Sequence, residues 1–105
     1  DCAMRLFNGP IVQPEAVVCA DDAIAFGAMV AFHTLGLRVP EDVLVVGYND
    51  SPIARTTMPQ LTSVRPPFGQ IVTESLRLLA NGTAMPTRVA LTPQLIVRES
   101  SVNRR

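Results

Sequence analysis

Two short polar segments of the chain carry the residues best suited to chemistry: Asp21-Asp22 and Asn49-Asp50. Each pair directly follows an unbroken apolar run, at residues 16–20 and 43–47, of the kind that forms a buried strand in a parallel sheet. The carboxyl ends of parallel strands share one edge, and open α/β sheets bind ligands at that edge. Three carboxylates and one carboxamide there would suit a metal pocket, an acid–base site or a hydrogen-bonding surface for a hydroxyl-rich ligand.

Local structural roles account for half of this cluster. Asp22 stands just ahead of a predicted helix, where an aspartate is a favoured N-cap. Asp50 precedes Ser51-Pro52, a sequence typical of an Asx turn. We therefore expect Asp22 and Asp50 to serve structural or capping roles beside the cleft, which leaves Asp21 and Asn49 freer to meet a ligand.

The hydrophobic pattern predicts an α/β fold built on a parallel sheet. Strand 16–20, helix 23–35 and strand 43–47 form a right-handed βαβ unit. Further along, the pattern predicts a helical turn at 53–57 and a shorter strand at 61–64 that ends at Pro66-Pro67. A helix follows at 68–81, with Asn81-Gly82 as its C-cap. Closing strand segments are expected at Leu91 and 95–97, before a polar tail at 98–105 that frays into solvent.

Composition narrows the class of function. The 105 residues carry 9 cationic and 9 acidic side chains, so the formal charge is zero, which argues against phosphate-based nucleic-acid binding and against a basic membrane-surface helix. All 9 cations are arginine. The missing lysine excludes a Schiff-base mechanism and a magnesium phospho-receiver, which needs a lysine at a later strand end. No apolar run reaches the roughly 20 residues that span a bilayer.

The remaining reactive residues have structural explanations. His33 is the single histidine and lies inside an apolar helix, so we expect a structural role. Cys2 and Cys19 are too few for a disulfide framework and lack zinc-site spacing, which favours a reducing compartment. We expect Cys19 to be a small buried hydrophobic residue. No phosphate loop, nucleophile elbow or metal-ligand spacing is present, so no cofactor and no metal are predicted.

Several consecutive blocks of the chain resemble the lactose-repressor/galactose-repressor (LacI/GalR) family of transcriptional regulators. The order and spacing of these blocks are kept over nearly the whole chain. They are residues 20–28 (ADDAIAFGA), 36–43 (GLRVPEDV), 45–50 (VVGYND), 59–65 (PQLTSVR) and 95–100 (LIVRES).

The resemblance implies the later part of a sensor domain built like a periplasmic sugar-binding protein, with two α/β lobes and the effector in the cleft between them. Residues 1–65 would belong to the C-terminal lobe, residues 66–84 to a crossover and a helix that packs with the N-terminal lobe, and residues 85–105 to a return strand and tail. Because the chain begins at Asp1 without Met or signal peptide, we expect a piece of a longer protein whose helix-turn-helix head lies upstream.

The family's effector contacts correspond to Asp21, Asn49 and Phe68. The family more typically has Asn at the first position and Asp at the second, so this chain exchanges carboxylate and carboxamide between two strand ends. Phe68 would offer its ring to a sugar or nucleobase, although it also suits the core-facing start of an amphipathic helix.

These expectations describe a cytoplasmic, homodimeric effector-binding region of a regulator, not an enzyme. Its partners would be a small sugar-like effector and, only through the upstream head, operator DNA; no membrane is involved. An exported sugar-binding protein of the same fold, serving a transporter or receptor, is the alternative. A small α/β enzyme comes third, because lysine, paired histidines and a nucleophile are lacking.

Overall fold

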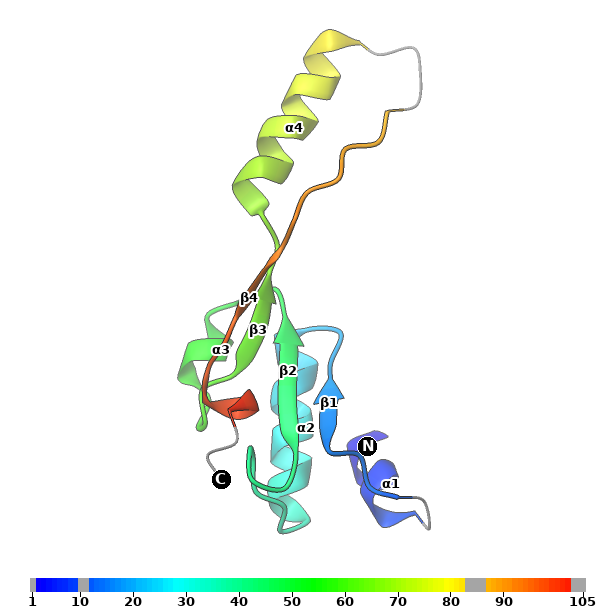
Figure 1. Ribbon diagram of the computed structural model, residues 1–105, viewed down its shortest axis with the longest axis vertical. Coiled ribbons are helices and arrows are strands. Elements are labelled where there is room, and N and C mark those ends of the chain that lie inside the picture. Colours follow the sequence, from blue (N-terminus) through cyan, green and yellow to red (C-terminus); the bar gives the residue numbers. More distant parts are fainter. Residues whose placement is uncertain (1, 10–11, 83–86, 103–105) are drawn as a thin grey trace.

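A four-stranded sheet forms the centre of the protein, for which a computed structural model describes residues 2–9, 12–82 and 87–102. The strands are β1 (Ala16–Val18), β2 (Leu44–Tyr48), β3 (Thr62–Arg65) and β4 (Gln94–Ile96), and they lie side by side in that order (Figure 1). β1, β2 and β3 are parallel, with Val18 opposite Val46 and Gly47 opposite Ser63, whereas β4 runs antiparallel to β3. The predicted parallel α/β fold is confirmed.

Helix α2 (Asp22–Thr34) links β1 to β2 and covers the sheet. Its Ala25 and Phe32 are fully buried together with Val43, Val45 and Leu61. Helix α1 (Cys2–Asn8) packs on α2, and the Phe7 ring meets Phe32 edge-on with 4.8 Å between centroids. Cys19 is buried as predicted, and this burial, with the nearby Asp21 charge, raises the pKa of its thiol. The core therefore lies between α2 and the first three strands.

The edge strand β1 differs from the prediction. Its apolar run predicted burial on both faces, yet Ala16 is exposed and Val18 is 77% exposed. β1 is the outermost strand of this sheet, and of its three residues only Val17 packs against the core. An apolar run identifies a strand without telling how many of its faces are covered.

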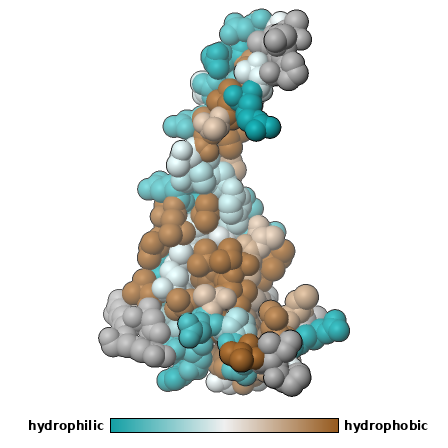
Figure 2. Space-filling model, turned by 45° about the vertical axis from the view of Figure 1, so that its right-hand side comes forward, coloured by the Kyte–Doolittle hydropathy of each residue, from teal (hydrophilic) through white to brown (hydrophobic). Residues whose placement is uncertain are grey.

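Helix α4 (Phe68–Asn81) stands away from the sheet as an arm (Figure 1). It has the predicted bounds and ends at Gly82, whose φ of 53° is the left-handed conformation that favours glycine. None of its residues is buried, although Figure 2 shows apolar side chains on the arm as well as on the body. Its exposed apolar residues are Phe68, Ile71, Val72, Leu76 and Leu79. The radius of gyration is 17.6 Å, against about 13 Å for a compact domain of this size.

The segment after β4 also differs from the prediction. Leu91 lies outside β4, and the predicted fraying tail instead forms a short 3-10 helix, η1 (Glu99–Ser101), against the sheet. The Ser100 hydroxyl, fully buried, donates to the Val45 carbonyl (2.6 Å) and accepts from the Thr62 amide (2.8 Å). These strand groups need buried partners, and the segment supplies them. Arg104-Arg105, also predicted to be solvated, lie outside the described residues.

Helix α3 (Ile53–Thr56) is the single turn predicted between β2 and β3. In the part of the chain that the structure describes, no helix has the length and apolar character needed to cross a membrane.

Candidate functional site

The two polar segments singled out in the sequence lie at the carboxyl ends of β1 and β2, on the side of the sheet from which α4 projects (Figure 1). Parallel pairing of β1 with β2 brings the strand ends together, and a hydrogen bond joins the segments directly: the Ser51 amide donates to Asp22 Oδ2 (2.7 Å). The expectation that Asp21-Asp22 and Asn49-Asp50 share one edge of the sheet is confirmed.

The helix cap belongs to Asp21 rather than to Asp22, so the predicted N-cap at Asp22 is wrong by one residue. Asp21 has extended backbone, and its Oδ1 accepts a hydrogen bond from the Ile24 amide (2.7 Å). This bond satisfies one of the free amides at the start of α2. Asp21 is half-buried, and Oδ2 of Asp21 takes part in no hydrogen bond within the described residues.

Asp22 is a buried structural carboxylate with 1% of its surface exposed. It accepts three hydrogen bonds: from the Ser51 amide (2.7 Å), the Ser51 hydroxyl (2.8 Å) and the Ser63 hydroxyl (2.6 Å). No ion pair reaches it within the described residues, so neutral donors and the positive end of α2 compensate its charge. Asp22 thereby ties the start of α2 to β3 and to the loop after β2.

Gly47 gives Asp22 the room it needs. A Cβ on Gly47 would overlap Asp22 Oδ1 and come within 3.2 Å of its Cα and 3.0 Å of Leu61 Cδ2. A side chain at position 47 would therefore displace the carboxylate or the strand.

Asp50 does not form the predicted Asx turn. Pro52 has no amide hydrogen to offer, and the carboxylate instead accepts from two guanidinium groups. Arg65 donates through Nε to Oδ2 (2.8 Å), and its Nη2 lies 2.6 Å from the same oxygen as an ion pair. Arg98 donates through Nη2 to Oδ1 (2.6 Å). The Asp50 side chain is 1% exposed, and a third arginine, Arg55, lies 3.8 Å away.

The electrostatics of Asp50 are set by burial and by arginine. Burial alone would raise the pKa of the carboxyl, but the hydrogen bonds and charges of Arg98 and Arg65 outweigh it, so the pKa of Asp50 lies below its ordinary value of 3.8. The carboxylate is ionised at neutral pH.

Asn49 and Phe68, the other two predicted effector contacts, are exposed. Asn49 has a φ of 100°, its amide donates to the Val64 carbonyl (2.8 Å), and its carboxamide makes no hydrogen bond with any described residue. Phe68 begins α4 and is 54% exposed. The structure thus places Asp21 and Asn49 on one edge of the sheet and Phe68 just beyond Pro66-Pro67, at the root of the arm.

The residues that sequence reasoning missed are those that hold this edge together: Gly47, Ser51, Ser63, Arg65 and Arg98. Gly47 at a strand end next to the polar segment was a usable signal of close approach. The others belong to distant parts of the sequence, and nothing local marks them as partners of Asp22 and Asp50.

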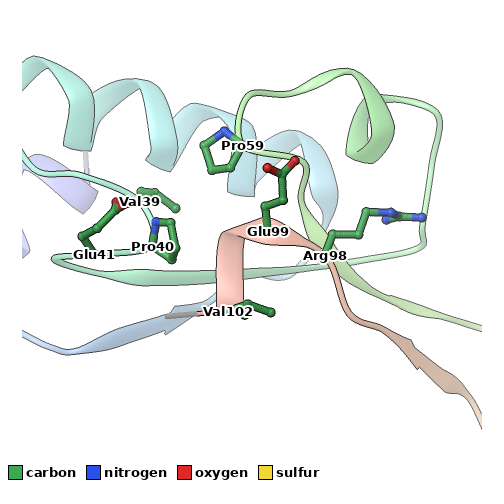
Figure 3. A pocket seen from close by; sticks show the side chains of 7 residues that line it. All are labelled: Val39, Pro40, Glu41, Pro59, Arg98, Glu99 and Val102. Atoms are coloured by element: carbon green, nitrogen blue, oxygen red, sulfur yellow. The ribbon is translucent and has the colours of Figure 1, made fainter. Parts of the chain in front are cut away.

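A cavity of ≈ 470 Å³ lies elsewhere, between the loop that precedes β2, Pro59 and η1 (Figure 3). Figure 3 shows the Arg98 side chain extending away from Glu99 and Val102, two others of its lining residues. The cavity borders the amino end of β2, not the carboxyl edge that holds Asp21 and Asn49.

The chemistry available at the carboxyl edge is hydrogen bonding. Asp22 and Asp50 are occupied by internal donors, and no group of three potential metal-ligating side chains occurs in the described ranges. Two groups have no hydrogen-bond partner among the described residues: Oδ2 of the half-buried Asp21 and the carboxamide of the exposed Asn49. The first is an acceptor, and the second both donates and accepts.

Comparisons with known proteins identify the family. The model of the periplasmic binding protein-like domain matches residues 3–101. The HTH-type transcriptional regulator MalR of Streptomyces coelicolor is 45% identical over 92 residues, which are 84% of this chain and 27% of that protein. The regulator CelR of Thermobifida fusca is 41% identical over 93% of this chain and 30% of its own length, and the Escherichia coli ribose operon repressor 32% identical over 96% and 32%.

Solved structures agree with these relatives. A CelR–cellobiose complex superposes with a TM-score of 0.76 at 41% identity, covering 83% of this chain and 28% of that one. The lac repressor dimer bound to operator and the anti-inducer ONPF superposes with a TM-score of 0.80 at 35% identity, covering 96% and 36%. The chain spans about a quarter to a third of the length of the curated relatives it matches. It belongs to the periplasmic-binding-protein-like domain family, as found in LacI-type transcriptional regulators.

Proposed function

We propose that this chain is the effector-binding and dimerisation region of a LacI-type DNA-binding transcriptional regulator, with a sugar or related metabolite as effector. The observation that carries the proposal is the carboxyl edge of the sheet, where Oδ2 of Asp21 and the Asn49 carboxamide have no partner among the described residues while Asp22 and Asp50 are fully hydrogen-bonded inside. That edge is the binding position of open α/β sheets. A related regulator of 41% identity is known as a complex with cellobiose, which supports a sugar as the ligand class.

In this proposal Asp21, Asn49 and Phe68 contact the effector. The free oxygen of Asp21 accepts from a ligand hydroxyl, and the Asn49 carboxamide donates to one oxygen and accepts from another. Phe68, with half its surface exposed, offers a ring face to the apolar side of a sugar.

The proposed division into lobes follows the arm. Residues 1–65 form the C-terminal lobe, residues 66–84 cross over and belong with the N-terminal lobe, and residues 85–105 return. The support is the apolar stripe of α4, which nothing in the described chain buries. Operator DNA would be bound only through an N-terminal head.

The setting we propose is a cytoplasmic homodimer without catalytic activity. The relatives are transcriptional regulators, and one structural neighbour is a repressor dimer. Sedimentation of the complete regulator tests the dimer: a monomer at micromolar concentration contradicts it.

Calorimetric titration of the complete regulator tests effector binding. The probes are cellobiose, sucrose and ribose, the sugars named for its relatives. We expect saturable binding of at least one, weakened about ten-fold or more by Asp21→Asn, which puts an NH2 donor where the free acceptor oxygen was, or by Asn49→Ala, which removes the carboxamide. Asp21→Asn keeps a good helix cap, so a loss of affinity reports on the ligand contact. No binding of any of the three by the wild type contradicts the proposed sugar class.

Solution scattering tests the regulatory step. A sugar that binds should change the angle between the lobes, because regulation requires two arrangements with different affinity for the ligand. An unchanged scattering curve under saturating sugar contradicts the lobe-closure part of the proposal.

A further inference from the structure

We propose that Asp50, gripped by Arg65 and Arg98, is a positioning residue that holds Asn49 in place for the effector. This inference rests on the proposed function above and assigns a role to three residues that are not themselves expected to touch the ligand.

Asn49 and Asp50 both have positive φ, at 100° and 49°. Residues other than glycine adopt this region at a cost, which Asn and Asp bear more readily than most, and they stay there only when their surroundings fix them. The conformation is what turns the chain away from β2 and leaves the Asn49 carboxamide on the exposed side.

The backbone amides of this loop are held one after another. The Asn49 amide donates to the Val64 carbonyl (2.8 Å), the Asp50 amide to the Ser63 hydroxyl (2.9 Å) and the Ser51 amide to Asp22 (2.7 Å). All three acceptors lie on β3 or at the start of α2. None of these bonds uses the Asp50 side chain, so they would survive its replacement if it played no part in holding the loop.

The Asp50 carboxylate adds a second, longer-range anchor. Arg65, which binds the carboxylate, is the last residue of β3 and directly precedes Pro66-Pro67. Arg98, the other partner, lies in the segment that follows β4. β3 and β4 are the two strands that lead into and out of the arm (Figure 1). Asp50 therefore fixes the Asn49 loop to both connections of α4.

The two arginines are unequal. The Arg98 side chain is 11% exposed and also donates from Nη1 to the Leu61 carbonyl (2.8 Å), whereas the Arg65 side chain is 42% exposed. We call Asp50 with Arg65 and Arg98 the clamp. Arg98 is its more firmly held side, and Arg65 lies next to Pro66-Pro67, the proposed crossing between the lobes.

The experiment combines amide exchange with sugar titration in the complete regulator, for wild type, Asp50→Asn and Arg65→Gln. The matched control is Asp42→Asn, which removes another arginine-bound aspartate, at Arg38, outside this loop. Arg65→Gln removes one of the two arginine partners of Asp50 at a half-exposed side chain, so it can be measured if Asp50→Asn folds poorly.

We expect Asp50→Asn to speed exchange of the Asn49, Asp50 and Ser51 amides about ten-fold or more while the α2 amides stay protected. At a temperature where the variant is fully folded by circular dichroism, sugar affinity should fall about ten-fold as well, and Asp42→Asn should change neither quantity. A merely structural role would lower the melting temperature without moving affinity in the folded protein.

Two results overturn the inference: unchanged exchange of the three amides in Asp50→Asn, or faster exchange with unchanged sugar affinity. The exchange measurement needs no ligand. If the wild type binds none of cellobiose, sucrose and ribose, the proposed sugar class fails, and exchange in Asp50→Asn still decides whether the clamp exists.

Discussion

The turn from β1 into α2 and the loop from β2 into α3 each hold an aspartate with a buried side chain, but by different hydrogen-bond partners. Each begins with a polar residue at the surface, Asp21 or Asn49, followed by a buried aspartate, Asp22 or Asp50. In our proposal the outer residue of each pair contacts the ligand, whereas the inner residue holds the turn through its own hydrogen bonds.

The difference lies in how the buried charge is compensated. Asp22 relies on three neutral donors and a helix N-terminus, whereas Asp50 is held by two guanidinium groups, one at the end of β3 and one in the segment after β4. The neutral donors connect Asp22 to the loop after β2 and to β3, whereas the arginines connect Asp50 to the end of β3 and to the segment after β4, which adjoin the arm. The comparison indicates that Asp22 serves the core of the body and Asp50 the junction with the arm.

Asp22→Ala should give the largest effect on stability. It leaves the Ser51 amide and two hydroxyls without their acceptor, and we expect a loss of about 3 kcal/mol in the free energy of unfolding. Urea denaturation measures it. The exposed pair of Arg38 and Asp42 provides the control, because Asp42→Ala should cost under about 1 kcal/mol; equal losses in both variants would mean that Asp22 is no special anchor.

Gly47→Ala should have the next largest effect. We expect the free energy of unfolding to fall by about 2 kcal/mol, because the added Cβ overlaps the Asp22 carboxylate. Combining it with Asp22→Ala tests the cause. If the carboxylate is what the methyl group meets, the double variant should lose less stability than the sum of the two single losses. Simple additivity would contradict the proposed contact.

Asp50→Asn should cost about 2 kcal/mol at neutral pH, since it weakens charge-assisted hydrogen bonds from Arg65 and Arg98. Because the pKa of Asp50 in the folded protein lies below its ordinary value, its contribution is present above that value and is lost as pH falls through the folded pKa. The stability difference between wild type and variant should therefore be constant from pH 7 to about pH 5 and shrink below about pH 4. A difference that grows on acidification has the wrong sign.

Asp21→Ala should cost about 1 kcal/mol through loss of the helix cap, and Asp21→Asn close to nothing, because Asn caps equally well. Thermal melts of both variants measure this. Comparable destabilisation by Asn and by Ala would show that the charge of Asp21, and not its capping bond, supports the turn.

Leu76→Gln should give the smallest effect in the 105-residue chain, within about 0.5 kcal/mol, because that side chain is 61% exposed and α4 buries no residue. In the complete regulator we expect a larger loss, because the proposed N-terminal lobe would cover the stripe. Equal effects in the two settings, measured by urea denaturation, would contradict the proposed lobe division.

Local patterns in the sequence predicted the order of elements, the shared edge of Asp21 and Asn49, and the glycine cap at Gly82. They failed where the answer depends on distant partners. Arg98 lies 48 residues from Asp50 in the sequence, so a turn-like context concealed an ion pair. The N-cap was predicted at Asp22 but lies at Asp21, because either aspartate can cap a helix. The Ser51 and Ser63 donors bind the Asp22 carboxylate in the interior and leave Asp21 to cap α2.

A structure of the complete regulator with cellobiose or another bound sugar would test the division between outer and inner residues. We predict Asp21 or Asn49 within about 3 Å of a sugar hydroxyl, with Asp22 still bonded to Ser63 and Asp50 still bonded to Arg98. A sugar held by Asp22 or Asp50, or one seated in the cavity beside Glu99 while this edge stays empty, would contradict it.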